Sequence, residues 1–240
     1  MSIADKISNF YNALDQRFYQ LFHEVLKDFN ERAVHEFRVN IKKQVAFFHL
    51  LKGIDPRFRT EKAEALFFNL FKYAGAIRKV HIEKNILTNV DLNVKLSPEI
   101  LENLELQLAK KTEKYLQYDH KKDLHAIIKN RRLIRNRISR IPENHLNNGL
   151  NEYFLKLLEG LRSQSELCKL SETAFHDLRK LLKELFYNLF LINQLLEQRQ
   201  FTPDILKYLD QLQTSLGEWH DIHLTLKHFS KLENPDFSQL

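Results

Sequence analysis

Two segments of the chain present the same basic side chains at the same spacing. A His-x-x-Arg-x-x-x-Lys pattern begins at His35 and occurs again at His176, an offset of 141 residues. Arginine has a planar fork that can bind two oxygens, lysine carries a compact charge, and histidine can donate a hydrogen bond in either protonation state. This combination suits the oxygens of phosphate groups.

The spacing places these side chains on one stripe of a helix. At about 100° per residue, Arg38 and Lys42 lie within about 60° of His35, beside the apolar face of the same helix. Arg179 and Lys183 repeat the arrangement in the second copy. Basic groups stacked without an acid among them repel one another by a few tenths of a kcal/mol per pair, roughly. A chain that does this twice is expected to use both stripes for an anion.

The repeat extends beyond the stripes. Residues 74–81 align with 216–223 at an offset of 142, so that Gly75 and Gly217 occupy equivalent places. We interpret both glycines as points of close helix approach. The first repeat covers about 3–140 and the second about 142–231, and the second repeat has no counterpart of residues 98–140.

The composition favours a helical fold. Only five Gly and five Pro occur in 240 residues, 43% of the residues are hydrophobic, and no stretch alternates at period two. Helical periodicity predicts helices over 3–28, 31–51, 57–87, 98–141, 145–168, 171–198 and 203–230, with a point at 117–122 where the fourth could divide. The tail, Glu233–Leu240, has no clear periodicity. We predict a single all-α domain, 1–240, of long antiparallel helices in two four-helix-like bundles related by a pseudo-twofold repeat.

The positive charge of the chain is concentrated in one region. The net charge is +6, yet residues 110–140 alone contain eleven Lys or Arg against three acids. Such a concentration indicates attraction to a polyanion. No apolar run is long enough to span a membrane, no secretory signal is visible, and Cys168 is the single cysteine, which favours a cytoplasmic protein.

Three other functions are compatible with these features. The basic 110–140 segment could bind nucleic acid, although the aromatic residues fall mostly on buried faces rather than on a stacking platform. His220 and Asp221 could belong to a metal-dependent phosphohydrolase, but the further ligands of such a site are not recognisable. A helical adaptor for an acidic protein is the third. No nucleophile arrangement or phosphate-cradling glycine loop stands out, so we expect no catalysis, no metal and no cofactor.

The paired His-x-x-Arg-x-x-x-Lys helices, each followed by a Gly-x-x-Arg-Asp-like segment, resemble the CHAD domain (conserved histidine α-helical domain) over roughly residues 5–231. The resemblance implies two helical bundles about an approximate twofold axis, basic residues lining a central groove or pore, and binding of inorganic polyphosphate. It also implies that Lys43 faces the ligand beside the stripes. The chain departs from the family pattern in three places. The Arg-Asp pair appears as Arg78-Lys79 and as His220-Asp221, Glu184 stands where the first copy has Lys43, and the final helices of the second bundle are short or missing.

We therefore expect inorganic polyphosphate to lie across both stripes, helped by the Arg131–Arg135 region. The predicted ligand-binding residues are His35, Arg38, Lys42, Lys43, Arg78, Lys79, Arg131, Arg132, Arg135, His176, Arg179, Lys180, Lys183 and His220.

Overall fold

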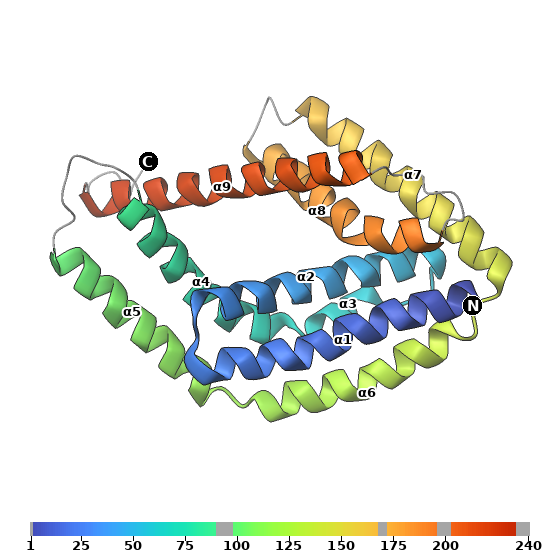
Figure 1. Ribbon diagram of the computed structural model, residues 1–240, viewed down its shortest axis with the longest axis horizontal. Helices are drawn as coiled ribbons and strands as arrows, with labels where there is room; N and C mark the ends of the chain where they lie inside the picture. The colour runs from blue at the N-terminus through green and yellow to red at the C-terminus, as the bar shows by residue number, and fades with distance from the viewer. Residues whose placement is uncertain (1, 90–97, 168–171, 196–202, 234–240) are drawn as a thin grey trace.

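The computed structural model describes residues 2–89, 98–167, 172–195 and 203–233, and within them the chain forms nine α-helices and no strand (Figure 1). The helices are α1 Ile3–Asp28, α2 Glu31–Ile54, α3 Thr60–Ala65, α4 Phe68–Asn89, α5 Pro98–Gln117, α6 His120–Ile138, α7 Glu143–Leu167, α8 Glu172–Leu195 and α9 Pro203–Glu233. The all-α prediction is confirmed for this part of the chain. The tail predicted to lack periodicity, Glu233–Leu240, falls outside the described residues except for Glu233.

Two of the predicted helices are divided in the structure. The expected helix 57–87 breaks between α3 and α4, where the Phe67 N–H donates to the Glu64 carbonyl at 2.9 Å and tightens the backbone. This turn brings Phe67 into the core against Phe18 and Phe48. The expected helix 98–141 divides inside the anticipated stretch, and the side chain of Asp119 accepts a hydrogen bond from the Lys121 N–H at the start of α6.

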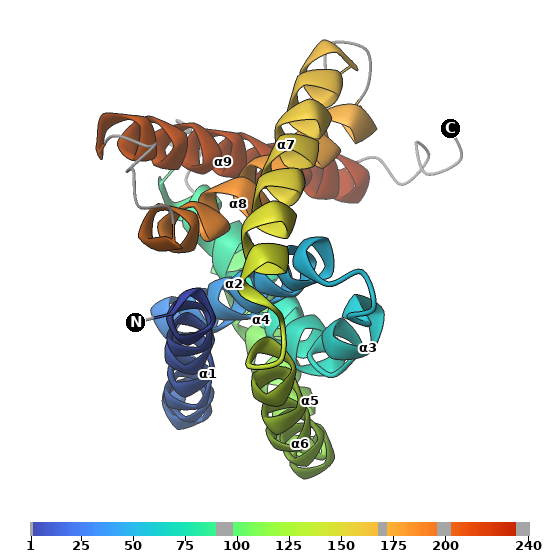
Figure 2. The same ribbon diagram turned by 90° about the vertical axis from the view of Figure 1, so that its right-hand side faces the viewer.

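Helix α2 is the element around which the others pack. It contacts α1, α3 and α4 of the first half and α7 and α8 of the second half. Aromatic side chains fill this centre, with Phe37, Phe47 and Phe48 of α2 fully buried. Figures 1 and 2 place α6 at one end of the molecule, beside α1, and α9 at the other, beside α8.

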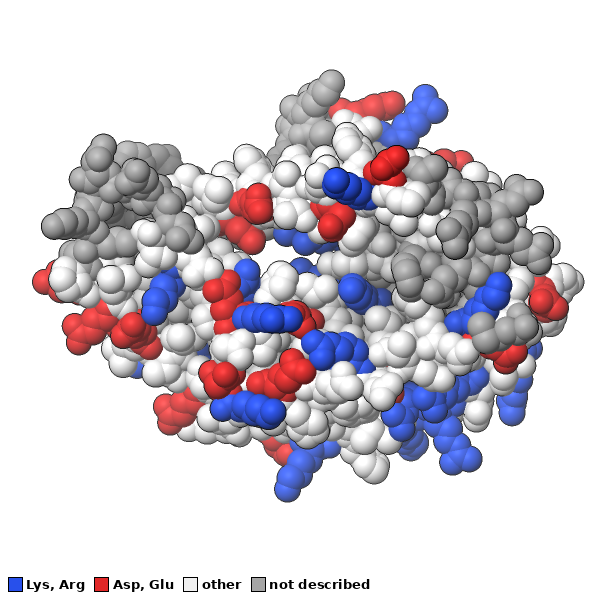
Figure 3. All heavy atoms as spheres, viewed as in Figure 1, with Lys and Arg blue, Asp and Glu red and all other residues white. Residues whose placement is uncertain are grey.

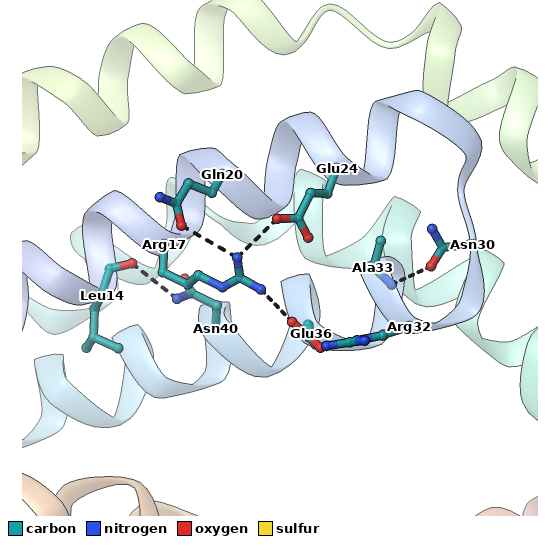
Figure 4. Close-up of polar contacts among 9 residues, drawn as sticks. All are labelled: Leu14, Arg17, Gln20, Glu24, Asn30, Arg32, Ala33, Glu36 and Asn40. Atoms are coloured by element: carbon teal, nitrogen blue, oxygen red, sulfur yellow. Dashed lines mark hydrogen bonds and ion pairs between the residues drawn. The ribbon is translucent and has the colours of Figure 1, made fainter.

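Polar contacts join α1 to α2 on the outer side of the pair (Figure 4). Phe29 adopts a left-handed conformation with φ 50°, and the Asn30 side chain then caps α2 by accepting from the Ala33 N–H at 2.8 Å. Arg17 of α1 donates to Glu36 of α2 at 2.6 Å, and the buried Asn40 amide donates to a carbonyl of α1. These bonds fix the angle at which α2 leaves α1, and so the direction of its basic stripe.

The second half packs on the first through glycine. A Cβ at Gly149 of α7 would lie 2.6 Å from the Ile54 Cα at the end of α2, closer than real Cβ atoms approach backbone. A Cβ at Gly160 of the same helix would be 3.4 Å from the nearest Leu181 methyl carbon, an ordinary contact. Gly149 is therefore required by the close approach of α7 to α2, whereas Gly160 is not.

We expect Gly149→Ala to lower the free energy of unfolding by about 1–3 kcal/mol, the usual cost of overpacking. Gly160→Ala, in the same helix, should raise it by about 0.5–1 kcal/mol because alanine restricts the unfolded chain and favours the helix. Urea denaturation of both variants provides the comparison. Equal effects of the two substitutions would contradict the close contact at Gly149.

Candidate functional site

The two basic stripes face each other across packed helices. His35, Arg38 and Lys42 lie on α2, and α8, which carries the second stripe, packs directly against α2. Lys42 is close enough to Lys183 of α8 for the charge of one to act on the other. The sequence repeat therefore brings six basic side chains from two distant segments into one place.

Arg38 is held by α4. Its Nη1 donates to the Phe71 carbonyl at 2.6 Å, and its guanidinium carbon lies 3.9 Å from the centre of the Phe71 ring. A Cβ at Gly75 would lie 2.4 Å from Arg38 Nη1, so the glycine leaves the space that the guanidinium occupies. The prediction of close helix approach at Gly75 is wrong, because the space beside this glycine is filled by the Arg38 side chain rather than by a helix backbone.

The second copy also places an arginine beside the equivalent glycine, but less tightly, because an added Cβ would make only an ordinary contact there. Arg179 of α8 lies beside Gly217 of α9, where an added Cβ would be 3.5 Å from Nη2. His176 lies against His220 of α9, with ring centres 5.2 Å apart. Nε of Arg179 and Nδ1 of His176 are buried and have no hydrogen-bond partner among the described residues. Buried polar groups are rarely left unpaired, so these atoms are available to an anion.

Burial and mutual repulsion alter the protonation of the lysines. Burial, followed by the charges of Lys183, Arg38 and Arg179, lowers the pKa of Lys42 to about 7. Burial and Arg179 lower the pKa of Lys183 to about 8. Desolvation and the neighbouring charges of Arg179 and His176 likewise lower the pKa of His220. An anion placed here would reverse these shifts by favouring the charged forms.

We call seven of these residues the basic cluster. They are His35, Arg38, Lys42, His176, Arg179, Lys183 and His220. Asp221 of α9 is an acid whose charge acts on Arg38, Lys42, Arg179 and Lys183. In the space-filling view an opening lies between α9 and the layer of α2, with Lys and Arg atoms at its edges (Figure 3). The helices that carry the basic cluster border this opening.

Comparison with known protein families gives a match over most of the chain. The family model of the CHAD domain matches residues 12–230 of the 240. The chain belongs to the CHAD domain family. No curated protein and no solved structure matches it. The match covers both stripes of this CHAD domain and all of the helices that hold them.

Four other predicted ligands of the CHAD domain lie near the cluster but have partners. Arg78 pairs with Glu31, and its charge acts on Arg38 and on His35. Lys79 pairs with Glu83 one turn along α4 at 3.5 Å. The Lys43 ammonium lies 5.9 Å from the centre of a tyrosine ring on α8, and Lys180 pairs with an aspartate of its own helix at 3.0 Å. Of these four, two act on the cluster through their charge: Arg78 on His35 and Arg38, and Lys180 on His176.

The structure does not bring the three predicted arginines of α6 together with the basic cluster. Arg131 pairs with the buried Asp15 of α1 at 2.8 Å, which makes it a packing residue. Arg132 is exposed, and Arg135 is half-buried on the same helix. Helix α6 lies at the end of the molecule away from α8 and α9 in both ribbon views, because its apolar face packs on α1. Helical periodicity identifies an exposed face but not the side of the protein on which it lies.

A polar junction that the sequence did not indicate holds α2 against α8. His49 Nδ1 lies 2.8 Å from a carboxylate oxygen of Glu184, and its Nε2 lies 2.7 Å from one of Glu64. The Tyr153 hydroxyl donates to Glu184 at 2.7 Å, and the Asn188 amide donates to the Ala46 carbonyl. These contacts set the position of the second stripe relative to the first. Glu184, which departs from the Lys43 pattern, therefore acts as a structural residue here.

The described residues contain no group of three or more His, Cys, Asp or Glu side chains placed to hold a metal ion. Nor does any helix within the described ranges combine the length and the apolar character needed to cross a bilayer.

The junction makes stability depend on pH through His49. The hydrogen bond to Glu184, with the charge of Glu184 and the bond and charge of Glu64, raises the pKa of His49 to about 9 in spite of the opposing effect of burial. A raised pKa means that the folded state binds the proton more tightly than the unfolded state. We expect the contribution of His49 to be complete below its ordinary value of 6.5 and to disappear as the pH rises through about 9. The check is the free energy of unfolding at several pH values for wild type and His49→Gln, since their difference should shrink with rising pH. A constant difference would contradict the junction.

Proposed function

We propose that this CHAD domain binds inorganic polyphosphate in the opening bordered by α2, α8 and α9, and that it does so without catalysis. The observation that carries the proposal is the convergence of the two duplicated stripes into one basic cluster with few neighbouring acids. Membership of a family associated with polyphosphate supports the choice of ligand. We further propose that the two halves are related by a pseudo-twofold repeat, which the matching pairs Arg38–Gly75 and Arg179–Gly217 support.

The chemistry of the cluster suits a chain of phosphates better than a nucleic acid. A linear polyphosphate has no bases, so it requires spaced cations and no stacking surface. Arginines anchored as Arg38 is can bind two phosphate oxygens each, and Lys42 and Lys183 add charge at the centre. The unpaired Nε of Arg179 and Nδ1 of His176 would gain acceptors from the ligand. Recognition would thus be electrostatic, with phosphate geometry selecting the arginine contacts.

Removing the two central lysines should weaken binding strongly. We expect Lys42→Gln/Lys183→Gln to reduce the affinity for long-chain polyphosphate by at least about tenfold, because each lysine makes a charge-assisted contact. The slope of log affinity against log salt should also fall, since fewer counterions are released. Titration calorimetry or fluorescence anisotropy at several salt concentrations measures both quantities. Neither lysine makes an ion pair within the described residues, so the fold should survive the change.

The matched control removes two lysines from the other basic surface. Lys122 and Lys129 of α6 are exposed, and Lys122→Gln/Lys129→Gln changes the net charge equally. We expect this variant to bind polyphosphate nearly as well as wild type. A larger loss in the α6 variant would place the ligand on α6 and overturn the proposed site. Competition by single-stranded RNA at equal phosphate concentration would favour the nucleic-acid alternative.

Binding should consume protons. At pH 7.5 the unliganded Lys42, with a pKa of about 7, is partly neutral, and polyphosphate should favour its charged form. Affinity is therefore expected to rise as the pH falls from about 8.5 towards 6.5, with net proton uptake on binding. Calorimetry in buffers of different ionisation enthalpy gives the number of protons. Lys42→Arg, which stays charged, should reduce the uptake, and an unchanged uptake would exclude Lys42 as its source.

A further inference from the structure

Helix α9 carries an exposed apolar stripe on the side away from the basic cluster. Its five large members are 42–64% exposed: Ile205, Tyr208, Trp219, Ile222 and Leu226. At about 100° per residue they fall within about 100° of the helix circumference, and the partly buried Leu212 lies among them. Gly217 and Asp221, which face the cluster, lie on the opposite side of the helix. Contiguous apolar patches of this kind mark interaction surfaces rather than ordinary solvent-facing residues.

The internal repeat shows what normally covers this face. At the offset of 142 residues, Trp219 and Ile222 of α9 correspond to Ile77 and Val80 of α4. These two residues of α4 are 0% and 2% exposed, whereas their counterparts on α9 are each 46% exposed. The same stripe is therefore buried in the first half and open in the second.

Helix α5 covers the stripe on α4. Lys84, the counterpart of Leu226, pairs with Glu105 of α5 at 3.2 Å. Further along, the Asn69 amide donates to the hydroxyl of Tyr118, just after α5, at 2.8 Å, and Tyr73 contacts the ring of the same tyrosine. The two helices run in opposite directions (Figure 1). The face of α9 is thus built to receive an antiparallel helix. Helix α8 reaches only one edge of it, where the ring of Phe175 lies 4.5 Å from that of Trp219, and the five side chains stay 42–64% exposed.

We propose that the occupant is a second copy of the chain, with α9 packed antiparallel against α9 in a twofold dimer. The stripe is self-complementary, since it has apolar side chains at both ends and the helix, 31 residues long, spans about 46 Å. Lys207 and Glu218 flank it on the same edge, eleven residues or about three turns apart. Both are exposed, and neither makes an ion pair within the described residues. Antiparallel pairing brings the Lys207 of each copy to the edge where the other copy has Glu218.

The dimer would leave the polyphosphate site open. The basic cluster uses the side of α9 with Gly217 and Asp221, and the stripe uses the other side, so the two surfaces do not compete. The dimer also does not depend on the proposed ligand. A monomer that binds polyphosphate would contradict only the dimer. A dimer that does not bind polyphosphate would contradict only the proposed function.

The test is the molar mass in solution combined with the emission of Trp219, the single tryptophan of the chain. Light scattering and sedimentation should give a dimer that dissociates on dilution between about 100 and 1 µM, as mass action requires. The emission should shift to longer wavelength over the same range as Trp219 becomes exposed. Tyr208→Glu and Ile222→Glu, near opposite ends of the part of the stripe that this pairing buries, should each give a monomer of unchanged helical content.

The matched control is Leu133→Glu on α6, because Leu133 is 60% exposed and Tyr208 is 64% exposed. It should remain dimeric. A wild-type protein that is monomeric at about 100 µM with solvent-exposed emission would overturn the proposal. So would a monomer in which Trp219 is shielded, since a segment of the same chain would then cover the stripe. A dimer unaffected by both stripe variants would also overturn it.

Discussion

The repulsion between the basic side chains of α2 and α8 is the constraint on which the rest of the structure depends. Lys42 and Lys183 lie close together with Arg38 and Arg179. Besides burial, the charges of Lys183, Arg38 and Arg179 lower the proton affinity of Lys42, and that of Arg179 lowers the proton affinity of Lys183. Such an arrangement opposes the packing of the two helices and must be offset elsewhere. The aromatic centre of α2 and the contacts of His49 and Asn188 supply that attraction a few turns away.

The arginines of the two stripes differ in how firmly other residues hold them before a ligand binds. Arg38 is tied to a carbonyl and a ring of α4, so little freedom is left for it to lose when an anion binds. Arg179 has the matching glycine but an unpaired Nε, so its guanidinium gains more from a ligand. The two halves are therefore not equivalent, although their sequences correspond. In the first half the arginine is already held in place without a ligand, whereas in the second half its hydrogen bonds are completed only when a ligand binds. The two halves also differ at the apolar faces of α4 and α9, because α5 covers the face of α4 and the corresponding face of α9 is exposed.

Much of the fold could be predicted from the sequence because the helices are long and strongly amphipathic. The starts of α1 and α9 follow from Ser2 as a capping residue and from Pro203 as the first residue of its helix. The division at Phe67 could not be predicted, since it depends on a ring entering the core between two other helices. For the site, the repeat identifies two stripes that the fold brings close together, whereas Arg131, a predicted ligand contact, pairs with Asp15. The sequence around Arg131 does not indicate that its partner is Asp15, more than a hundred residues earlier. Asp221 was visible in the repeat beside His220, and only the structure shows how many cations it acts on.

The lowered proton affinity of Lys42 and Lys183 has a consequence for selectivity. Under the proposed function, the number of charges in the opening depends on what occupies it, because a neutral lysine is recharged when enough negative potential is nearby. A chain with a charge on every phosphate provides that potential, whereas a small monovalent anion does not. The opening therefore responds to the linear charge density of its ligand. Dilute small anions would meet a surface charged mainly by its arginines, and a dense polymer would meet one that becomes more positive as it enters.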